Sequence, residues 1–475
     1  MLFNSIVFAI FLPIVFVLYW FVFRNSLKLQ NLLIVLASYV FYGWWDWRFL
    51  ALILFSTLVD FFVAQELQKT AIKRHQKGLL AISLLCNLGL LGFFKYYNFF
   101  ISSWIDAWDL VGVRMDLQTL QIILPVGISF YTFQTLSYTI DVYRQKLEPT
   151  HDFIQFSAFV SFFPQLVAGP IERASNLLPQ FKKPRIFNSD FAVSGFYLII
   201  WGLFKKVVVA DNCAFFVNQI FDGTHSYSSL ELFFGAVLFG FQIYGDFSGY
   251  SDIAIGVARL FGFRLMVNFS FPYFSRDISE FWRRWHISLS TWFRDYVYIP
   301  LGGSHGSRWL QIRNVFIVFL VSGFWHGANW TFIVWGGIHA LLFLPLLLAK
   351  VNRAYVGETV ISLVQVPRIL LTFILVSFAW IYFRADTLAI AHTFILKIFS
   401  FKDVTLTLFY ATSKSQLFSF IICMSIFIML FFEFLAIQKN RKEVQLTTYS
   451  AIFISLLIML MGVFKNPSDF IYFQF

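Results

Sequence analysis

Two of the eight histidines in this 475-residue sequence stand where an imidazole could act on a substrate. His326 lies in the apolar run VFIVFLVSGFWHGANWTFIVWGG, with apolar residues on both sides. Polar residues at membrane depth are costly and are functional candidates by default. A neutral imidazole, with a reference pKa of about 6.5, can accept a proton near neutral pH. We therefore predict that His326 is a general base; a histidine that only bridges helices by hydrogen bonds is the alternative.

The residues next to His326 predict an interruption of the helix. Gly323, Gly327 and Asn329 flank the histidine, and such residues are typical of a break or a close approach between helices. A break would leave the imidazole in an internal cavity. In an unbroken helix His339 would lie about 20 Å further along, so we do not expect it to touch the same atoms as His326.

His286 precedes His326 by 40 residues, in the arginine-rich stretch FWRRWHISLSTWFRDYVYIP. Its ring could orient a substrate, act as an acid, or bond a backbone carbonyl, so a site role and a scaffold role are both open. Apolar residues recur every fourth position at Phe281, Trp285 and Leu289, which predicts an amphipathic helix rather than a span. An interfacial helix that turns its arginines toward lipid head groups is the simplest interpretation.

Three arginines of this stretch could also contact a donor substrate. Guanidinium groups bind phosphate well, so Arg283, Arg284 and Arg294 could attract the phosphates of coenzyme A or an acidic carrier protein. The alternative is that they only set the topology, since Lys and Arg gather in cytoplasmic loops. The net charge of +11 has the same explanation, and we expect no nucleic-acid partner.

Further polar side chains stand in apolar segments and could line a hydrated tunnel. The candidates are Asp246, Ser248, Tyr250, Tyr131, Gln134 and Asn329. Interhelical hydrogen bonding is the alternative for most of them. The sequence has no HExxH, P-loop or CxxC pattern, and its three cysteines are far apart. We therefore expect no metal and no bound cofactor.

Membrane helices must position these residues. Of the chain, 59% is hydrophobic and 13% is charged, about half the charge of a soluble domain. The apolar segments predict an all-α polytopic membrane protein with about 11–13 spanning or re-entrant helices and amphipathic interfacial helices, because each span needs about 20 residues. Basic segments at 65–77 and 439–442 predict cytoplasmic loops, which places both termini outside. We predict a single membrane-embedded domain over residues 1–475.

Several long motifs, in the same order, resemble the membrane-bound O-acyltransferase family, nearest to its bacterial alginate O-acetylation branch. Two of them carry the histidines, FWRRWHISLSTWFRDYVYIPLGG (281–303) and SGFWHGANWTFIVWGGIHA (322–340). The other four are LIVLASYVFYGWW (33–45), LPVGISFYTFQTLSYTIDVYR (124–144), FFPQLVAGPIER (162–173) and DFSGYSDIAIG (246–256). The resemblance extends from residue 1 to about 345 and thins beyond it.

This resemblance implies both a fold and an activity. The family's membrane histidine falls on His326 and its second histidine on His286, inside a ring of helices around a central tunnel. The donor would be a cytoplasmic thioester, acetyl-CoA or an acyl carrier protein. The acceptor would be a hydroxyl of a partner protein or glycan outside, with an extracytoplasmic acetyltransferase as a further partner. The chain would lie in a bacterial inner membrane and pass an acetyl group to an envelope polysaccharide.

A second class of function fits the same buried histidines. A proton-coupled transporter or channel could use them as a relay. Internal inverted repeats would favour a transporter, and the sequence shows none. Acyl transfer is therefore the first hypothesis.

Overall fold

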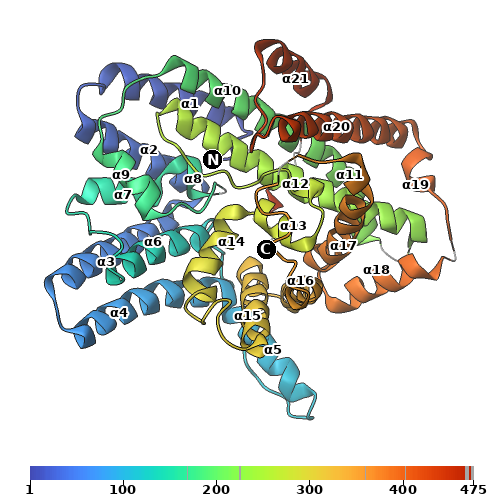
Figure 1. The fold of residues 1–475 in the computed structure, drawn as a ribbon, viewed down its shortest axis with the longest axis horizontal. Coiled ribbons are helices and arrows are strands. Elements are labelled where there is room, and N and C mark those ends of the chain that lie inside the picture. Colours follow the sequence, from blue (N-terminus) through green and yellow to red (C-terminus); the bar gives the residue numbers. More distant parts are fainter. Residues whose placement is uncertain (168, 224–225, 359, 402, 466–469, 472–475) are drawn as a thin grey trace. The chain divides into compact units, whose positions relative to one another are not determined.

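A computed structural model describes residues 1–167, 169–223, 226–358, 360–401, 403–465 and 470–471. These residues form α-helices, joined by short 3-10 and π turns, and the described part of the chain contains no β-strand (Figure 1). The chain divides into two compact units, residues 1–193 with 257–265 and residues 194–256 with 266–475. The single domain over 1–475 stays a prediction, while the all-α class is confirmed.

The first unit is built from the N-terminal helices. They are α1 (Ile6–Val17), α2 (Leu27–Asp46), α3 (Leu50–Lys69), α4 (Lys73–Leu91), α5 (Tyr97–Asp109), α6 (Ile128–Tyr143), α7 (Phe153–Ser161), α8 (Phe163–Leu166) and α9 (Ala174–Lys182). Helices α3, α4 and α6 pack on one another (Figure 1). The carboxylate of Asp60 in α3 accepts hydrogen bonds from Asn87 in α4 (2.9 Å) and Thr139 in α6 (3.0 Å). Polar contacts between apolar helices thus hold these three together.

The second unit contains both candidate histidines. Its helices include most of α10 (Ser189–Leu203) and α12 (Ser229–Leu260), together with α11 (Asp211–Asp222), α13 (Ile278–Arg284), α14 (Ile287–Phe293), α15 (Arg308–His326), α16 (Trp330–Leu348), α17 (Val366–Arg384), α18 (Leu388–Ser400), α19 (Thr407–Tyr410), α20 (Ser413–Gln438) and α21 (Thr448–Met461). Helix α16 packs between α15 and α17.

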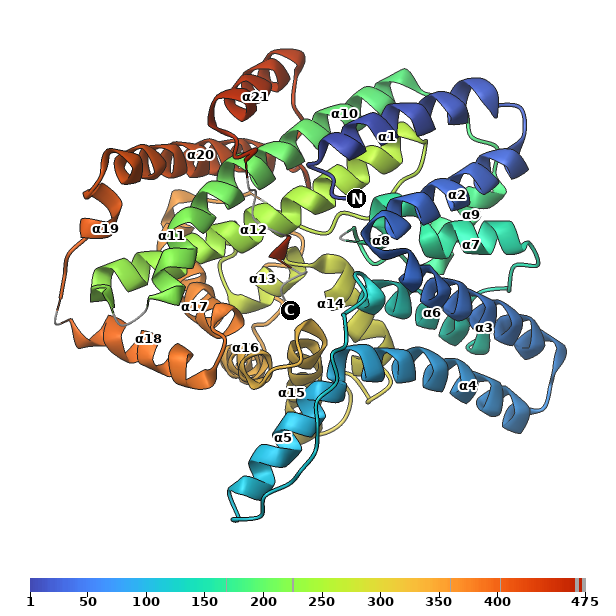
Figure 2. The ribbon, with the colours of Figure 1, turned by 180° about the vertical axis from the view of Figure 1, so that it is seen from behind.

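Glycine allows α10 and α12 to approach closely (Figure 2). A Cβ added at Gly202 would lie 2.5 Å from the carbonyl oxygen of Gly249, and one added at Gly249 would lie 2.7 Å from that of Gly202. Small residues facing each other in this way are common where membrane helices pack backbone to backbone.

Seven helical stretches of the described residues are long and apolar enough to cross a membrane. They are Leu27–Lys69, Lys73–Asp109, Ser189–Asp222, Ser229–Leu260, Trp330–Leu348, Leu363–Arg384 and Ser413–Gln438, and four shorter apolar helices accompany them at Ile6–Val22, Phe153–Leu166, Leu388–Ser400 and Thr448–Met461. Three of the seven contain two successive helices each, α2 with α3, α4 with α5 and α10 with α11. The chain is thus a multi-pass membrane protein, as predicted, with some of its expected spans joined end to end.

The arginine-rich stretch differs from its predicted form. A single amphipathic helix was expected across Phe281, Trp285 and Leu289, but α13 ends at Arg284 and α14 begins at Ile287. His286 between them adopts a left-handed backbone conformation, with φ of 43°. Trp285 and Leu289 are both buried, so the apolar spacing reflects packing on two short helices rather than one exposed face.

Candidate active site

His326 stands at the turn between two packed helices. It is the last residue of α15, where the extended backbone of Gly327 ends the helix. Asn329 then caps α16, since its side chain accepts a hydrogen bond from the backbone N–H of Thr331 (3.0 Å). A Cβ at Gly323 would collide with the carbonyl oxygen of Phe332. The predicted break and close approach are therefore confirmed, and they position the imidazole inside the unit, 2% exposed.

His286 lies beside His326. The centroids of the two rings are 6.3 Å apart, and Trp325 contacts both, at 6.1 Å from His286 and 5.1 Å from His326. His286 is fully buried and packs against the ring of Phe247 at 4.6 Å. The two histidines named from the sequence are thus brought together from segments 40 residues apart.

Asn268 fixes the tautomer of His286. Its side-chain oxygen accepts hydrogen bonds from the backbone N–H of Ser288 (3.2 Å) and from the Ser288 hydroxyl (2.8 Å), and it lies 3.2 Å from Nδ1 of His286. A backbone N–H can only donate, so this Asn268 atom is the acceptor and Nδ1 of His286 must carry the proton. Nε2 of the neutral ring is therefore an acceptor, and it has no hydrogen-bond partner among the described residues.

The environment of His286 favours the neutral ring. Burial lowers its pKa to about 3, and His286 lies outside the seven long apolar stretches. Of the described side chains that contact its ring, His326 is the one that can titrate near neutral pH, and the others are Phe247, Phe269, Trp325, Asn268 and Ser288. A neutral imidazole can orient a hydroxyl by accepting its hydrogen bond. With a pKa of about 3, the His286 ring is almost entirely unprotonated at pH 7.

This geometry makes Asn268 a positioning residue for His286. In Asn268→Leu, the loss of the acceptor frees the tautomer, and we expect turnover to fall about 10-fold, the effect of one buried hydrogen bond. In Asn268→Asp, the carboxylate keeps the acceptor and favours protonated His286, so activity should survive at neutral pH while its acid limit moves to higher pH. Rates measured from pH 4 to pH 9 check both variants. If the two variants lose equal activity and the pH profile does not move, Asn268 has a purely structural role.

A layer of aromatic rings surrounds the pair. Trp335 of α16 packs 5.1 Å from His326 and 4.9 Å from His339, and Phe383 of α17 packs 5.4 Å from His326. The turn after His326 folds α16 back along α15, so His339 and His326 share a neighbour. The prediction that His339 does not touch the same atoms as His326 assumed an unbroken helix, and that assumption is wrong, because α15 ends at His326 and α16 begins at Trp330.

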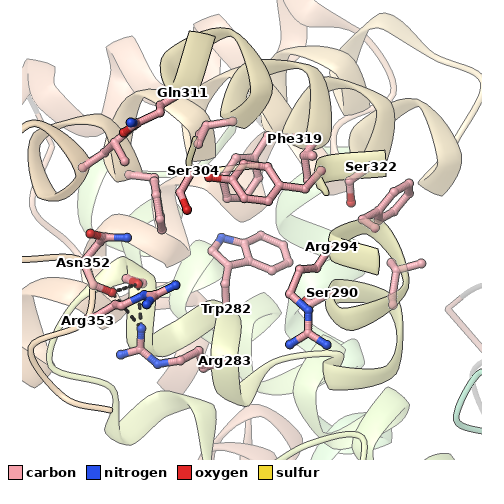
Figure 3. A pocket seen from close by; sticks show the side chains of 18 of the residues that line it. Trp282, Arg283, Ser290, Arg294, Ser304, Gln311, Phe319, Ser322, Asn352 and Arg353 are labelled. Atoms are coloured by element: carbon pink, nitrogen blue, oxygen red, sulfur yellow. Dashed lines mark hydrogen bonds between the residues drawn. The ribbon is translucent and has the colours of Figure 1, made fainter. Parts of the chain in front are cut away.

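A cavity of about 530 Å³ opens in the same unit, between α13, α14, α15 and α16 (Figure 3). Its wall includes Trp282, Ser290, Phe319 and Ser322, and Ser322 precedes His326 by one helical turn. Of the described residues that line it, none is an aspartate or a glutamate, and four carry positive charge: Arg283, Arg294, Lys350 and Arg353. The cavity therefore suits an anionic ligand with an apolar part.

The three predicted donor-binding arginines differ in surroundings. Arg283 donates to the carbonyl oxygen of Asn352 (2.9 Å), and its Nη2 is buried with no partner among the described residues. Arg294 lines the cavity and pairs with Asp295 (2.8 Å). Arg284 is not among the lining residues and instead pairs with Glu280 (2.8 Å). Donor binding by all three stays a prediction.

Most of the residues proposed to line a tunnel make polar contacts with other segments, while the hydroxyl of Tyr131 has no hydrogen-bond partner among the described residues. Lys206 pairs with Asp246 (2.8 Å) and lies 5.7 Å from the ring centre of Tyr250, while Ser248 accepts a hydrogen bond from Lys205 (2.9 Å). In the first unit, Gln134 donates to the carbonyl oxygen of Phe159 (2.6 Å) and Tyr131 is buried. Besides capping α16, Asn329 donates to the carbonyl oxygen of Asp386 (2.9 Å). The tunnel stays a prediction.

Sequence reasoning missed three residues of this site: Asn268, Trp282 and Ser322. Only Asn268 carried a signal, a lone amide in the apolar segment 265–274. Trp282 and Ser322 carry no signal in their own segments. They reach the same cavity only because α13 and α15, which carry them, both pack on α16.

Fold and site together define a multi-pass membrane protein with two buried histidines in the same unit as a basic cavity, although neither histidine is among the described residues that line it. The sequence model of the membrane-bound O-acyltransferase family matches residues 91–357, and the chain belongs to that family. The chain is thus an O-acyltransferase that takes an acyl donor as substrate, which favours the enzyme over the transporter or channel.

Similar proteins extend this match over most of the chain. A protein named as a probable alginate O-acetylase of Pseudomonas aeruginosa is 40% identical over 403 residues, 84% of this chain and 75% of the relative. A peptidoglycan O-acetyltransferase of Helicobacter pylori is 38% identical over 420 residues, 82% of this chain and 78% of the relative. A teichoic acid D-alanyltransferase of Bacillus subtilis is 30% identical over 230 residues, covering 46% of this chain and 57% of the relative.

Proposed function

We propose that this enzyme takes an acetyl group from a cytoplasmic thioester and passes it across the membrane for O-acetylation of an extracytoplasmic polysaccharide. The observation that carries the proposal is the pair of buried histidines, 6.3 Å apart, in the same unit as a cavity lined by four cations. The cavity would hold the donor, and the histidines would activate the acceptor.

The names of the relatives support the acetyl group and the glycan acceptor. The relatives that cover more than four fifths of this chain are named for O-acetylation of alginate or peptidoglycan. The D-alanyltransferase relative covers less than half of it. Acetyl is therefore the preferred group, and an envelope polysaccharide is the preferred acceptor.

The cavity fits the phosphate-bearing arm of a thioester donor. A volume of about 530 Å³ lies within the range of about 300–1,000 Å³ that is usual for ligand sites. Guanidinium groups bind phosphate oxygens in a fork, and the unpartnered Nη2 of Arg283 is a donor available for such a contact. Acetyl-CoA and an acetylated acyl carrier protein share this chemistry.

The reaction needs one base and no metal. The acceptor hydroxyl attacks the thioester carbonyl while His326 takes its proton, and Nε2 of His286 orients the glycan by accepting a hydrogen bond from a neighbouring hydroxyl. The tetrahedral intermediate then expels the thiolate as the C–S bond breaks. The protonated His326 gives its proton to the thiolate, so the ring returns to its neutral form and a free thiol leaves.

Charge and hydropathy support an orientation in a bacterial inner membrane. Basic segments 65–77 and 439–442 favour the cytoplasmic side, which leaves both termini outside. An acceptor polysaccharide would then meet the histidines from the other side, directly or through an extracytoplasmic acetyltransferase.

The test is acetyl transfer by the full chain in liposomes. Acetyl-CoA and an acetylated acyl carrier protein, each with labelled acetyl, are offered from one side, and alginate oligomers or peptidoglycan strands from the other. We expect release of free thiol with one donor and label on a glycan hydroxyl. Release of thiol from neither donor, in protein that stays folded, would overturn the proposal.

Arg283 provides a prediction for the donor cavity. Arg283→Gln removes a cation that lines the cavity, and the loss of one charge-assisted hydrogen bond should raise the KM for the donor about 10-fold with a smaller change in kcat. The matched control is its neighbour, in the variant Arg284→Gln, which removes one of the two arginines paired with the buried Glu280 and should lower the melting temperature more than the donor affinity. An equal rise of KM in both variants would contradict the assignment of Arg283 and favour a general effect of charge.

A further inference from the structure

We propose that Trp282 determines the acyl-chain length of the donor, because its indole forms the part of the cavity wall that contacts the aromatic layer around His326. The inference rests on the proposed function, because it assumes that the cavity holds a thioester. Its indole is part of the cavity wall, and Figure 3 shows it in the middle of the labelled lining residues.

Trp282 stands between the cavity and the layer that covers His326. Its ring lies 5.4 Å from Phe319 in the cavity wall and 5.7 Å from Trp335, and Trp335 packs 5.1 Å from His326. On the other side Ser322 also lines the cavity, about 6 Å along α15 from His326, since a helix rises 1.5 Å per residue. A carbonyl that reaches His326 from the cavity must therefore come close to both Ser322 and the indole.

His339 holds the indole in this place. The indole Nε1–H of Trp282 donates to Nδ1 of His339 (3.3 Å). Because an indole N–H can only donate, Nδ1 is the acceptor and the neutral His339 carries its proton on Nε2. The imidazole also lies 6.3 Å from the rings of Phe281 and Phe319, which are both nearly parallel to it. Trp282 is thus clamped by a buried hydrogen bond and not only by packing.

A fixed indole at the reacting end limits what lies beyond the carbonyl. An acetyl group carries one methyl there, whereas a butyryl group carries two more methylenes that would occupy the volume of the indole. In a fitted apolar pocket, one extra methylene changes the ratio of kcat/KM between two substrates by about 10–200-fold. The wall at Trp282 therefore selects short acyl groups, and His339 contributes as a positioning residue.

The experiment compares acyl-chain profiles. The full chain in liposomes receives the donor that supports acetyl transfer, loaded with acetyl, propionyl or butyryl, and free thiol is measured. In Trp282→Ala we expect the butyryl-to-acetyl ratio to rise about 10-fold or more, and in Trp282→Phe to rise less. In His339→Leu, which leaves the indole but removes its acceptor, a smaller rise in the same direction is expected.

Phe343→Ala is the matched control. Phe343 also lines the cavity, but it lies eight residues beyond Trp335 on α16, about 12 Å further along the helix. This variant enlarges the cavity away from His326 and should leave the chain-length ratio unchanged.

The outcomes separate this proposal from the proposed function. An unchanged ratio in Trp282→Ala and Trp282→Phe, with acetyl transfer still measurable, would overturn the role of Trp282 alone. An equal rise in Phe343→Ala would also overturn it, because cavity volume rather than the indole would then set the profile. If the native chain releases no thiol from any loaded donor, the donor cavity itself fails. Melting temperatures identify a variant that does not fold, and Trp282→Phe then carries the test.

Discussion

Replacing His326 by alanine is expected to reduce acyl transfer by about 10²–10⁴-fold, the usual contribution of a general base. The ring is 2% exposed and lies 6.3 Å from His286, whose pKa is lowered by burial and which is therefore a weaker base. In His326→Gln the side chain can still donate and accept hydrogen bonds, but it cannot take a proton at neutral pH. We expect both variants to lose turnover alike, measured as labelled acetyl transferred by protein of unchanged melting temperature.

His339 is a control for the loss of a buried imidazole. His339→Ala removes a ring that touches the same Trp335, at 4.9 Å compared with 5.1 Å for His326. Any general damage to this aromatic layer should therefore be similar in the two alanine variants. Only His326 is proposed to take the proton of the acceptor hydroxyl. The loss of acyl transfer in His326→Ala should therefore exceed the loss in His339→Ala by at least about 10-fold. Comparable losses would reassign His326 to packing.

The sequence allowed the place of His326 to be predicted because the signals are local. Gly323, Gly327 and Asn329 all lie within three residues of the histidine, and each acts on the backbone next to it. The membrane class was equally predictable, since hydrophobicity sums over the chain and needs no knowledge of contacts. Both depend on neighbouring residues or on composition, and the structure confirms both.

The rest of the site depends on contacts between distant residues. The bond between Trp282 and His339 joins residues 57 apart, and nothing in either segment marks the pair. The apolar spacing around Trp285 predicted one helix because periodicity detects a buried face, and it cannot detect a break when residues on both sides of the break are buried. The left-handed backbone of His286 is such a break. Its role is apparent only from the contact between the His286 ring and Asn268, which the sequence does not show.

The close approach of α15 and α16 leads to the second large effect. A Cβ at Gly336 would collide with the backbone carbonyl of Phe319, and backbone cannot move aside without shifting α15. We expect Gly336→Ala to destabilise the protein by about 1–3 kcal/mol, as overpacking does. Because α15 ends at His326, the shift also displaces the imidazole, and a displacement of about 1 Å can cost about 10²-fold in rate. The melting temperature and acetyl transfer measure the two effects.

The adjacent glycine makes this test specific. A Cβ at Gly337 would meet only the side chain of Leu320, at an ordinary contact distance of 3.7 Å. Gly337→Ala places the same methyl group one residue further along the same helix, and where there is room the change from glycine to alanine stabilises by about 0.4–1 kcal/mol. We therefore expect opposite signs from two neighbouring substitutions. If both destabilise equally, helix propensity or the lipid contact governs this segment, and the backbone contact between α15 and α16 does not hold His326 in place.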